Sequence, residues 1–220
     1  MYKVDLHTHS TASPDGGLTA VQYHQVLNSG VLNAVAITDH NRIDFATDLH
    51  RKMGELIIVG EEIMTTAGEI IGLYLEKLVK PHQSPLATVK AIKDQGGLVY
   101  IPHPFETVRK GLSAAIMEEL ADYIDIIETC NGRAFFQNRA SQAAVWARMA
   151  NKLGAASSDA HGLSGLGTTY TSVSQVPTRD TLLALLANGI QLTGRPTVRA
   201  LLYPKLNRLR KKTVNRRSRS

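Results

Sequence analysis

The sequence has almost no cysteine and no long apolar run, and both shortages narrow the class of protein. Its one cysteine, Cys130, excludes an internal disulfide and suits a reducing cytoplasm. No apolar run approaches the roughly 20 residues that span a bilayer, and the first residues do not have the apolar stretch of a signal peptide. We therefore expect a cytoplasmic protein without a membrane span.

Acidic and aromatic residues are both missing from the last sixteen residues. Residues 205–220 hold eight basic residues, within a chain whose formal net charge is +6. Without those eight, 17 basic residues stand against 19 acidic ones, a net charge of about −2. We expect residues 1–203 to form the folded domain and residues 204–220 to form a flexible basic tail. Such a run permits a weak polyanion contact, although it lacks aromatic stacking partners for bases.

Short apolar runs rich in β-branched residues alternate with longer helical patterns, which predicts βα units and a largely parallel sheet. Helices are expected after Thr19, after Ser84-Pro85, and over residues 137–153, where Gly154 would end the helix. The expected strands are residues 4–6, 34–38, 56–59, 69–75, 98–101, 124–128, 155–157 and 191–192.

Seven or eight such units are few for a regular eightfold barrel, which uses about 250 residues. A trimmed or distorted α/β barrel fits better. The alternative is a doubly wound open sheet, although no glycine-rich phosphate loop follows the first strand.

Five of the eight histidines lie within four residues after expected strands, and all of these except His103 have an acid or another histidine within two positions. His7 and His9 are two residues apart on an extended chain, so their side chains share one face. A lone histidine after a strand is more often a core or capping residue, but the ends of barrel strands surround one mouth. Imidazole and carboxylate groups together suit Zn²⁺, Mn²⁺ or Fe²⁺, which can generate a hydroxide from bound water at neutral pH. The pattern indicates a metal site.

Five motifs make the comparison with known proteins specific. They are Asp-Leu-His-Thr-His-Ser, Ile-Thr-Asp-His-Asn, Gly-Glu-Glu-Ile, Ile-Pro-His-Pro-Phe and Ser-Asp-Ala-His-Gly. Their order resembles the PHP family, named for polymerase and histidinol phosphatase domains, and the resemblance covers residues 2–195. It implies a distorted (β/α)7 barrel that holds two or three metals, Mn, Fe or Zn, and hydrolyses phosphoesters with a metal-bound hydroxide.

Carried over position by position, the resemblance implies three metal positions. Glu62 bridges the first two, and it is preferred to Glu61 because the family glutamate stands two residues after the glycine. Where some members supply a further histidine after the fourth strand, this chain has none, which leaves Glu69 or Cys130 to complete the second position. The implied ligands are His7, His9, Glu62 and Asp159 for the first metal, Glu62 and His103 for the second, and Asp15, His40 and His161 for the third.

Residues after the sixth expected strand face the same mouth. Arg133 is expected to bind phosphate through its planar guanidinium, and Asn131 to orient the substrate. The metal-bound hydroxide is assigned to Glu62, Asp159 and His103. Asp15 is the weakest ligand assignment, because residues 13–17 also read as a plain turn.

The sequence thus predicts an enzyme, a metal-dependent phosphatase or phosphodiesterase similar to the stand-alone members of the family. Its expected substrate is a nucleotide phosphomonoester or a short phosphodiester. One alternative is 5′–3′ trimming of short oligonucleotides. Two others come from different classes: an amidohydrolase, with Lys77 as the candidate bridging lysine, or a non-catalytic metal-binding module.

Overall fold

One curled sheet organises the molecule. The computed structural model describes residues 1–135 and 137–217, with the side chains of the last helix described as far as residue 213. Within that part of the chain, the sheet has nine strands. In spatial order they are β7 (Leu153–Ser157), β6 (Ile126–Asn131), β5 (Leu98–Ile101), β4 (Glu69–Leu73), β3 (Ile57–Met64), β2 (Ala34–Ile37), β1 (Tyr2–Asp5), β8 (Tyr170–Val173) and β9 (Ile190–Leu192).

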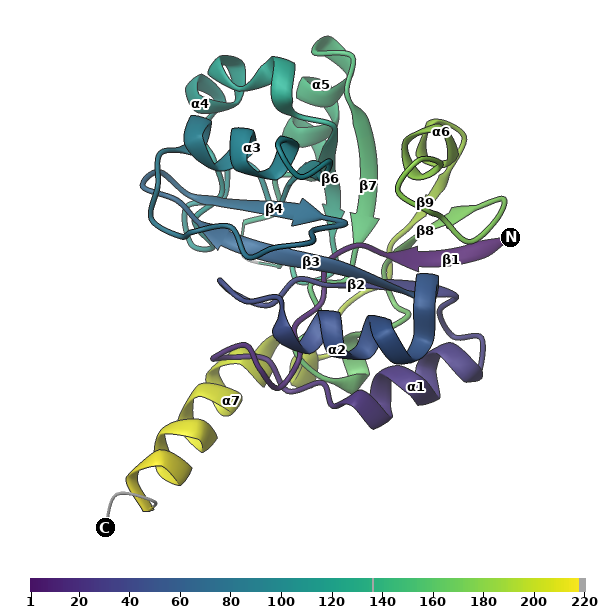
Figure 1. Ribbon diagram of the computed structural model, residues 1–220, viewed down its shortest axis with the longest axis vertical. Helices are drawn as coiled ribbons and strands as arrows, with labels where there is room; N and C mark the ends of the chain where they lie inside the picture. The colour runs from purple at the N-terminus through teal and green to yellow at the C-terminus, as the bar shows by residue number, and fades with distance from the viewer. Residues whose placement is uncertain (136, 218–220) are drawn as a thin grey trace.

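The sheet is nearly closed, and helices lie on its outer side (Figure 1). Thr8, after β1, forms a parallel bridge with Ala160, after β7. The backbone amide of Ala156 in β7 donates to Oγ1 of Thr171 in β8 at 2.9 Å. These contacts join strands from opposite ends of the sheet. The predicted α/β class and distorted barrel are therefore confirmed.

The sheet is less parallel than the sequence predicts. Two parallel groups, β1–β2–β3 and β5–β6–β7, are joined by β4, which is antiparallel to both β3 and β5. The reason is the length of β3, which continues to Met64 and leaves only Thr65–Gly68 before β4. A parallel crossover needs a dozen residues or more, so four residues can only make a hairpin. Thr65 closes that hairpin by donating its amide to the Gly68 carbonyl at 2.9 Å.

The helices begin where the capping residues predict. Thr19 forms a capping box with Gln22, and Ser84 caps the helix that starts at Pro85. The helices are α1 (Ala20–Asn28), α2 (Asp44–Met53), α3 (Pro85–Lys93), α4 (Ala114–Glu119), α5 (Ala140–Met149), α6 (Leu182–Ala187) and α7 (Val198–Arg217).

The predicted end of the helix over residues 137–153 is wrong. Helix α5 stops at Met149, and Gly154 lies inside strand β7. Asn151 takes the left-handed conformation, with φ 53°, and Lys152 returns its amide to the Ala147 carbonyl at 2.7 Å. Asparagine is the residue other than glycine that most readily ends a helix in this way.

The last helix also differs from the expectation. Residues 204–217 continue α7 instead of forming a flexible tail, and residues 218–220 lie outside the described residues. Figure 1 shows α7 leaving the body as a projecting helix. Its middle part is held by contacts of Asn207, Arg208 and Lys211 with loops around the site, described below. No helix among the described residues has the length and apolar character that crossing a membrane requires.

Apolar side chains fill the inside of the barrel and the space beneath the helices. Val4, Ile58, Ile71 and Ala155 belong to one buried cluster to which strands β1 to β8 all contribute. Tyr100 is fully buried in the same cluster and donates its hydroxyl hydrogen to Glu128 Oε1 at 3.0 Å. Polar groups such as Tyr100 and Glu128 therefore lie between the apolar core and one mouth of the barrel, where they support the candidate site.

Candidate metal centre

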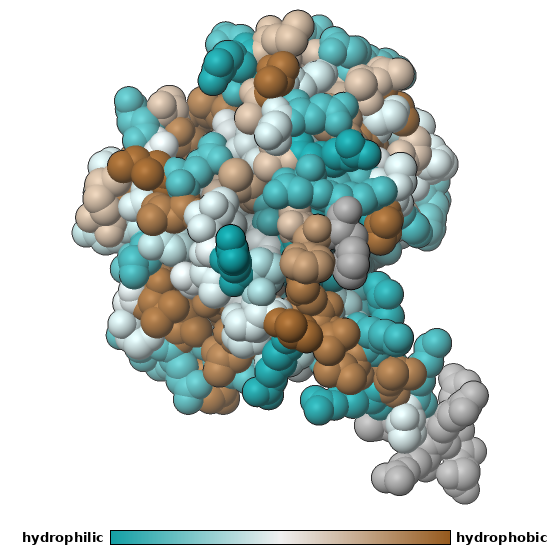
Figure 2. Space-filling view, turned by 180° about the vertical axis from the view of Figure 1, so that it is seen from behind, coloured by the Kyte–Doolittle hydropathy of each residue, from teal (hydrophilic) through white to brown (hydrophobic). Residues whose placement is uncertain are grey.

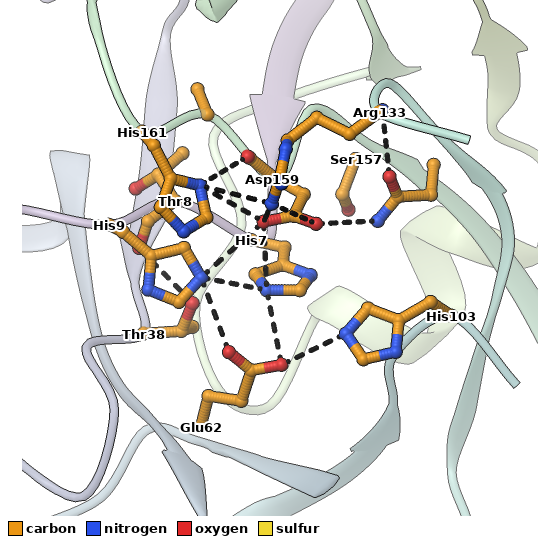
Figure 3. Close-up of polar contacts among 12 residues, drawn as sticks. His7, Thr8, His9, Thr38, Glu62, His103, Arg133, Ser157, Asp159 and His161 are labelled. Carbon is orange, nitrogen blue, oxygen red and sulfur yellow. Dashed lines mark hydrogen bonds and ion pairs between the residues drawn. The ribbon is translucent and has the colours of Figure 1, made fainter. Parts of the chain in front are cut away.

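Most of the expected ligands follow strands that open at this mouth, and Figure 3 shows histidines and carboxylates from different strands pointing toward one another. His7 and His9 follow β1, Glu62 lies within β3, His103 follows β5, and Asp159 follows β7. The structure brings together all the candidate ligands that are predicted from the sequence. The eight are His7, His9, Asp15, His40, Glu62, His103, Asp159 and His161.

The deepest group is formed by His7, His9 and Asp159, which could hold one metal ion. The Nε2 atoms of His7 and His9 lie 3.1 Å apart. Oδ1 of Asp159 lies 3.7 Å from Nε2 of His7 and 3.5 Å from that of His9. Glu62 reaches the same pair, with Oε1 3.5 Å from His7 and Oε2 3.3 Å from His9. Imidazole nitrogens and carboxylate oxygens therefore converge on one small volume.

A second group consists of His7, Glu62 and His103, which could hold another metal ion. Nε2 of His103 lies 3.1 Å from Glu62 Oε1. Glu69 belongs to a neighbouring group with His40 and Glu62, and its Oε2 lies 3.8 Å from His103 Nε2. Glu69 therefore lies where the second position lacks a ligand.

Cys130 has no part in these groups. Among the described residues, it belongs to no cluster of ligand atoms, and it lines a separate shallow pocket with Ala140 and Gly154. The strand bulges between Glu128 and Cys130, which puts the carboxylate of Glu128 into the site while the thiol faces elsewhere.

The third group lies nearest the solvent and combines His9, Asp15, His40 and His161. Asp15 receives both imidazoles: Oδ2 lies 3.5 Å from His40 Nε2, and Oδ1 lies 3.5 Å from His161 Nε2. The turn around Asp15 therefore places this carboxylate among the candidate ligands. His9 belongs to this group as well as to the deepest one.

Buried contacts orient the imidazoles. Nδ1 of His7 faces Glu128 Oε1 at 3.0 Å, and Nδ1 of His161 faces the Asp159 carbonyl at 2.9 Å. In each ring the other nitrogen, Nε2, is left to face the cluster. A carboxylate or carbonyl behind a metal-binding imidazole fixes the tautomer in this way. Glu128 was not nominated from the sequence, although a glutamate inside the apolar strand Ile126–Asn131 was a usable signal.

The electrostatics of the cluster suit bound cations. Burial lowers the pKa of His9, but hydrogen bonds to Asp159 and Glu62 outweigh it and raise that pKa to about 10. Burial raises the pKa of Glu69 to about 9, and the charge of Glu62 adds to the effect. The pKa of Asp159 falls well below its usual value, because Arg133 and His7 outweigh its burial. A proton on His9 and a proton on Glu69 therefore reduce the negative charge of the cluster, as bound divalent ions would.

Unpaired atoms support the same fit. Among the described residues, the buried Nδ1 atoms of His9 and His103 have no hydrogen-bond partner. Buried polar atoms are rarely left unpaired. His103 and Asp159 also have left-handed backbones, with φ 29° and 51°, which is costly for residues other than glycine and is typical of functional sites. The donor set therefore fits divalent transition metals.

The cluster lies at the base of a pocket of about 550 Å³. Arg133 and Arg109 both lie on its wall and both contact Asp159, through Nη1 at 3.2 Å and 2.8 Å from Oδ2. Arg109 was not nominated, because it lies in the long loop after β5 and not directly after a strand. Asn131 lies behind these arginines: its Nδ2 donates to Glu128 Oε2 at 2.8 Å, and its Oδ1 accepts from Arg109 Nη1 at 2.5 Å.

Comparisons with known proteins agree with this geometry. A family model described as PHP-associated matches residues 138–189. The chain is 34% identical over 137 residues to an uncharacterised protein of Methanocaldococcus jannaschii, a match that covers 56% of this chain and 80% of that protein.

Solved structures share the fold at low identity. One is a two-domain protein from Bacteroides vulgatus that contains a predicted PHP-like metal-dependent phosphoesterase, with a TM-score of 0.65 and 18% identity; the match covers 94% of this chain and 63% of that one. Another is an amidohydrolase from Chromobacterium violaceum, with a TM-score of 0.60 and 17% identity, covering 89% of this chain and 99% of that one.

The chain shares its barrel with these solved structures, and the mouth of the barrel gathers imidazoles and carboxylates suited to divalent metals. The chain belongs to the PHP family, and the resemblance seen in its motifs is confirmed.

Proposed function

We propose that the protein hydrolyses a phosphoester, namely a nucleotide phosphomonoester or a short phosphodiester, with two or three Mn, Fe or Zn ions. The observation that carries this proposal is the sharing of ligands between neighbouring groups. Glu62 contributes to two groups and His9 to two, so the groups lie side by side at the base of one pocket. Adjacent metals are suited to binding the attacking and leaving oxygens in the transfer of a phosphoryl group.

The residues divide into those that would hold metal and those that would hold substrate. His7, His9, Glu62 and Asp159 would hold the first ion, His103 the second with Glu62 and Glu69, and Asp15, His40 and His161 the third. Metals held there would supply positive charge and would lower the pKa of a water molecule so that it can act as a nucleophile at neutral pH. Arg133 binds a phosphate oxygen from the pocket wall. Asn131 acts indirectly, since its side chain braces Arg109 and Glu128.

The pocket favours a small substrate. Its volume of about 550 Å³ lies in the range of small-molecule sites, roughly 300–1,000 Å³. Trimming of short oligonucleotides is the second candidate, because Pro204 and Arg208 line the pocket and the basic helix α7 therefore passes along its edge. We also propose a cytoplasmic location, on the ground of the single cysteine.

Nothing around Lys77 supports an amidohydrolase with a bridging lysine. Lys77 is exposed, and its backbone amide donates to the Gln95 side chain at 2.8 Å, away from the pocket. The place between neighbouring groups is taken by Glu62. A non-catalytic module is disfavoured because all eight nominated ligands are present and convergent.

The proposal is tested by reconstitution and a substrate panel. Purified protein should carry two or three metals per chain after incubation with Mn²⁺, Fe²⁺ or Zn²⁺, and release phosphate from at least one phosphomonoester or dinucleotide. Elemental analysis and a phosphate assay measure the two results. Less than one metal per chain, or full loading without hydrolysis of any phosphoester, would refute the proposed function.

A further inference from the structure

The C-terminal helix contacts the backbone of the third ligand group. Asn207 of α7 is buried, and its Nδ2 donates to the carbonyl of Asp15 at 2.8 Å and to that of His161 at 3.0 Å. One amide group thus ties together two residues that face each other across the proposed third metal position. An amide with two fixed acceptors sets the separation of the segments that carry them.

Lys211, one helical turn further along α7, closes the loop that carries Asp15. Its ammonium group donates to the carbonyls of Thr11 at 2.8 Å, Ser13, and Gly16 at 2.9 Å. These three carbonyls use all three donors of a lysine. The loop is thereby held in one shape from Thr11 to Gly16.

Two glycines make this close approach of α7 possible. A Cβ atom on Gly17 would lie 2.7 Å from Asn207 Nδ2, and one on Gly162 would lie 2.5 Å from the Tyr203 ring. Both distances are shorter than real contacts allow. The loop with Asp15 and the loop with His161 therefore each have a glycine where α7 packs against them. This indicates specific packing of the helix and not an incidental contact.

Arg208 contacts the ligand carboxylate itself. Its Nη2 lies 2.6 Å from Asp15 Oδ2, the oxygen that also faces His40 Nε2 at 3.5 Å. The Arg208 side chain is more than half exposed and lines the pocket. Its guanidinium therefore supplies the positive charge that neutralises Asp15, and it can swing into solvent when another cation takes its place.

We propose that α7 is a positioning element for the third metal position. Asn207 and Lys211 hold the Asp15 loop in the shape that ligates, while Arg208 is a counter-ion that the metal displaces from Asp15. Asp15 needs this help more than the other ligands, because His9, His40 and His161 directly follow strands, whereas Asp15 lies within a turn. The inference rests on the proposed metal site but not on phosphoester hydrolysis.

The proposal predicts opposite effects from neighbouring residues of one helix. Asn207→Ala should weaken binding of the third metal by about tenfold or more, the scale seen when a group supporting a ligand is lost. Arg208→Ala should strengthen it, because Asp15 then has no competing cation. A helix with a merely structural role would weaken binding in both variants. Arg210→Ala is the matched control, since it removes an exposed arginine from the same helix.

The measurement is equilibrium dialysis of the full chain against graded Mn²⁺ without substrate, followed by elemental analysis. If Asn207→Ala fails to fold, Lys211→Met replaces it, since it keeps the aliphatic stem and removes the three donors; the expected weakening is the same. Unchanged third-metal affinity in the variant that folds, weaker binding in Arg208→Ala, or a wild type that never exceeds two metals would overturn the proposal. A wild type that binds three metals but cleaves no phosphoester would refute the proposed function and leave this inference to stand on the variants.

Discussion

Nδ1 of His7 lies 3.0 Å from Oε1 of Glu128, and this buried contact turns Nε2 of His7 toward the other candidate ligands. The same carboxylate accepts the backbone amide of His103 at 2.6 Å, so one side chain positions ligands that follow two different strands. Its own pKa lies below the usual value, because the charge of His7 outweighs its burial. Glu128 therefore stays ionised behind the site.

The first prediction concerns this carboxylate. Glu128→Gln should lower metal affinity by about 10–100-fold without removing any direct ligand, because His7 and His103 lose their orienting partner. Competition with a chromophoric chelator measures the affinity. Glu118→Gln is a suitable control, since Glu118 accepts a hydrogen bond from Trp146 Nε1 at 2.7 Å, away from the pocket. Equal affinities in the two variants would remove Glu128 from the support of the site.

The second prediction concerns two direct ligands. Glu62→Gln and Asp159→Asn keep the side-chain shapes and remove anionic oxygens, so each should lower turnover by on the order of 10²-fold or more. Circular dichroism should stay close to that of the wild type. Retention of more than half the activity by either variant would show that its assignment as a ligand is wrong.

Glu61 gives this experiment a close control. It is adjacent to Glu62 in β3 and buried, but its Oε2 accepts the Val79 amide at 2.9 Å, and it belongs to none of the ligand groups among the described residues. Burial raises its pKa to about 7. Glu61→Gln replaces a carboxyl group that is already partly protonated near neutral pH, so turnover should fall much less than in Glu62→Gln.

The convergence of the candidate ligands could be predicted from the sequence because one rule covers most of them. Strand ends gather at one mouth, so His7, His40, His103 and Asp159 could be placed together without knowing the register of the sheet. The preference for Glu62 over Glu61 agrees with the alternation of side chains along a strand, since only Glu62 reaches the cluster. In these cases local pattern and tertiary arrangement agree.

Other features were missed where contacts distant in the sequence decide the outcome. Arg109 reaches Asp159 from a long loop, across 50 positions of the chain. Asn207 and Arg208 meet Asp15 across more than 190 positions, and a cluster of basic residues gives no sign of that contact. Strand β4 is antiparallel because β3 continues as far as Met64 and leaves room only for a hairpin. The apolar periodicity of the sequence did not show how far β3 extends.

The third prediction separates substrate binding from metal binding at Arg133. Arg133→Ala should raise KM by roughly 10–150-fold, equivalent to about 1.5–3 kcal/mol for a lost ionic hydrogen bond. Metal content should be unchanged, because Arg109 still holds Asp159 at 2.8 Å. Arg42→Ala, which removes an exposed ion pair with Asp44, is the control. Unaltered kinetics across the substrate panel would make Arg133 a structural residue.

The fourth prediction decides between a small and a polymeric substrate. A chain ending at Thr213 keeps Asn207, Arg208 and Lys211 while it removes Arg216, Arg217 and Arg219. If the substrate is an oligonucleotide, this truncation should raise KM for long substrates and flatten the dependence of log(kcat/KM) on log salt concentration. The slope should fall by about 0.7 for each single-strand phosphate contact that is lost.

A nucleoside monophosphate offers one phosphate, which the metals and Arg133 would already hold under the proposed function, so its kinetics should not change on this truncation. Steady-state kinetics with a mononucleotide and a decanucleotide, each from low to physiological salt, measure the difference. Unchanged kinetics with both substrates would exclude the last seven residues from substrate binding. Equal losses with both would instead show that they act on the site through helix α7. We expect the small substrate to be preferred, because the pocket is of small-molecule size and residues 205–220 offer no aromatic surface on which bases could stack.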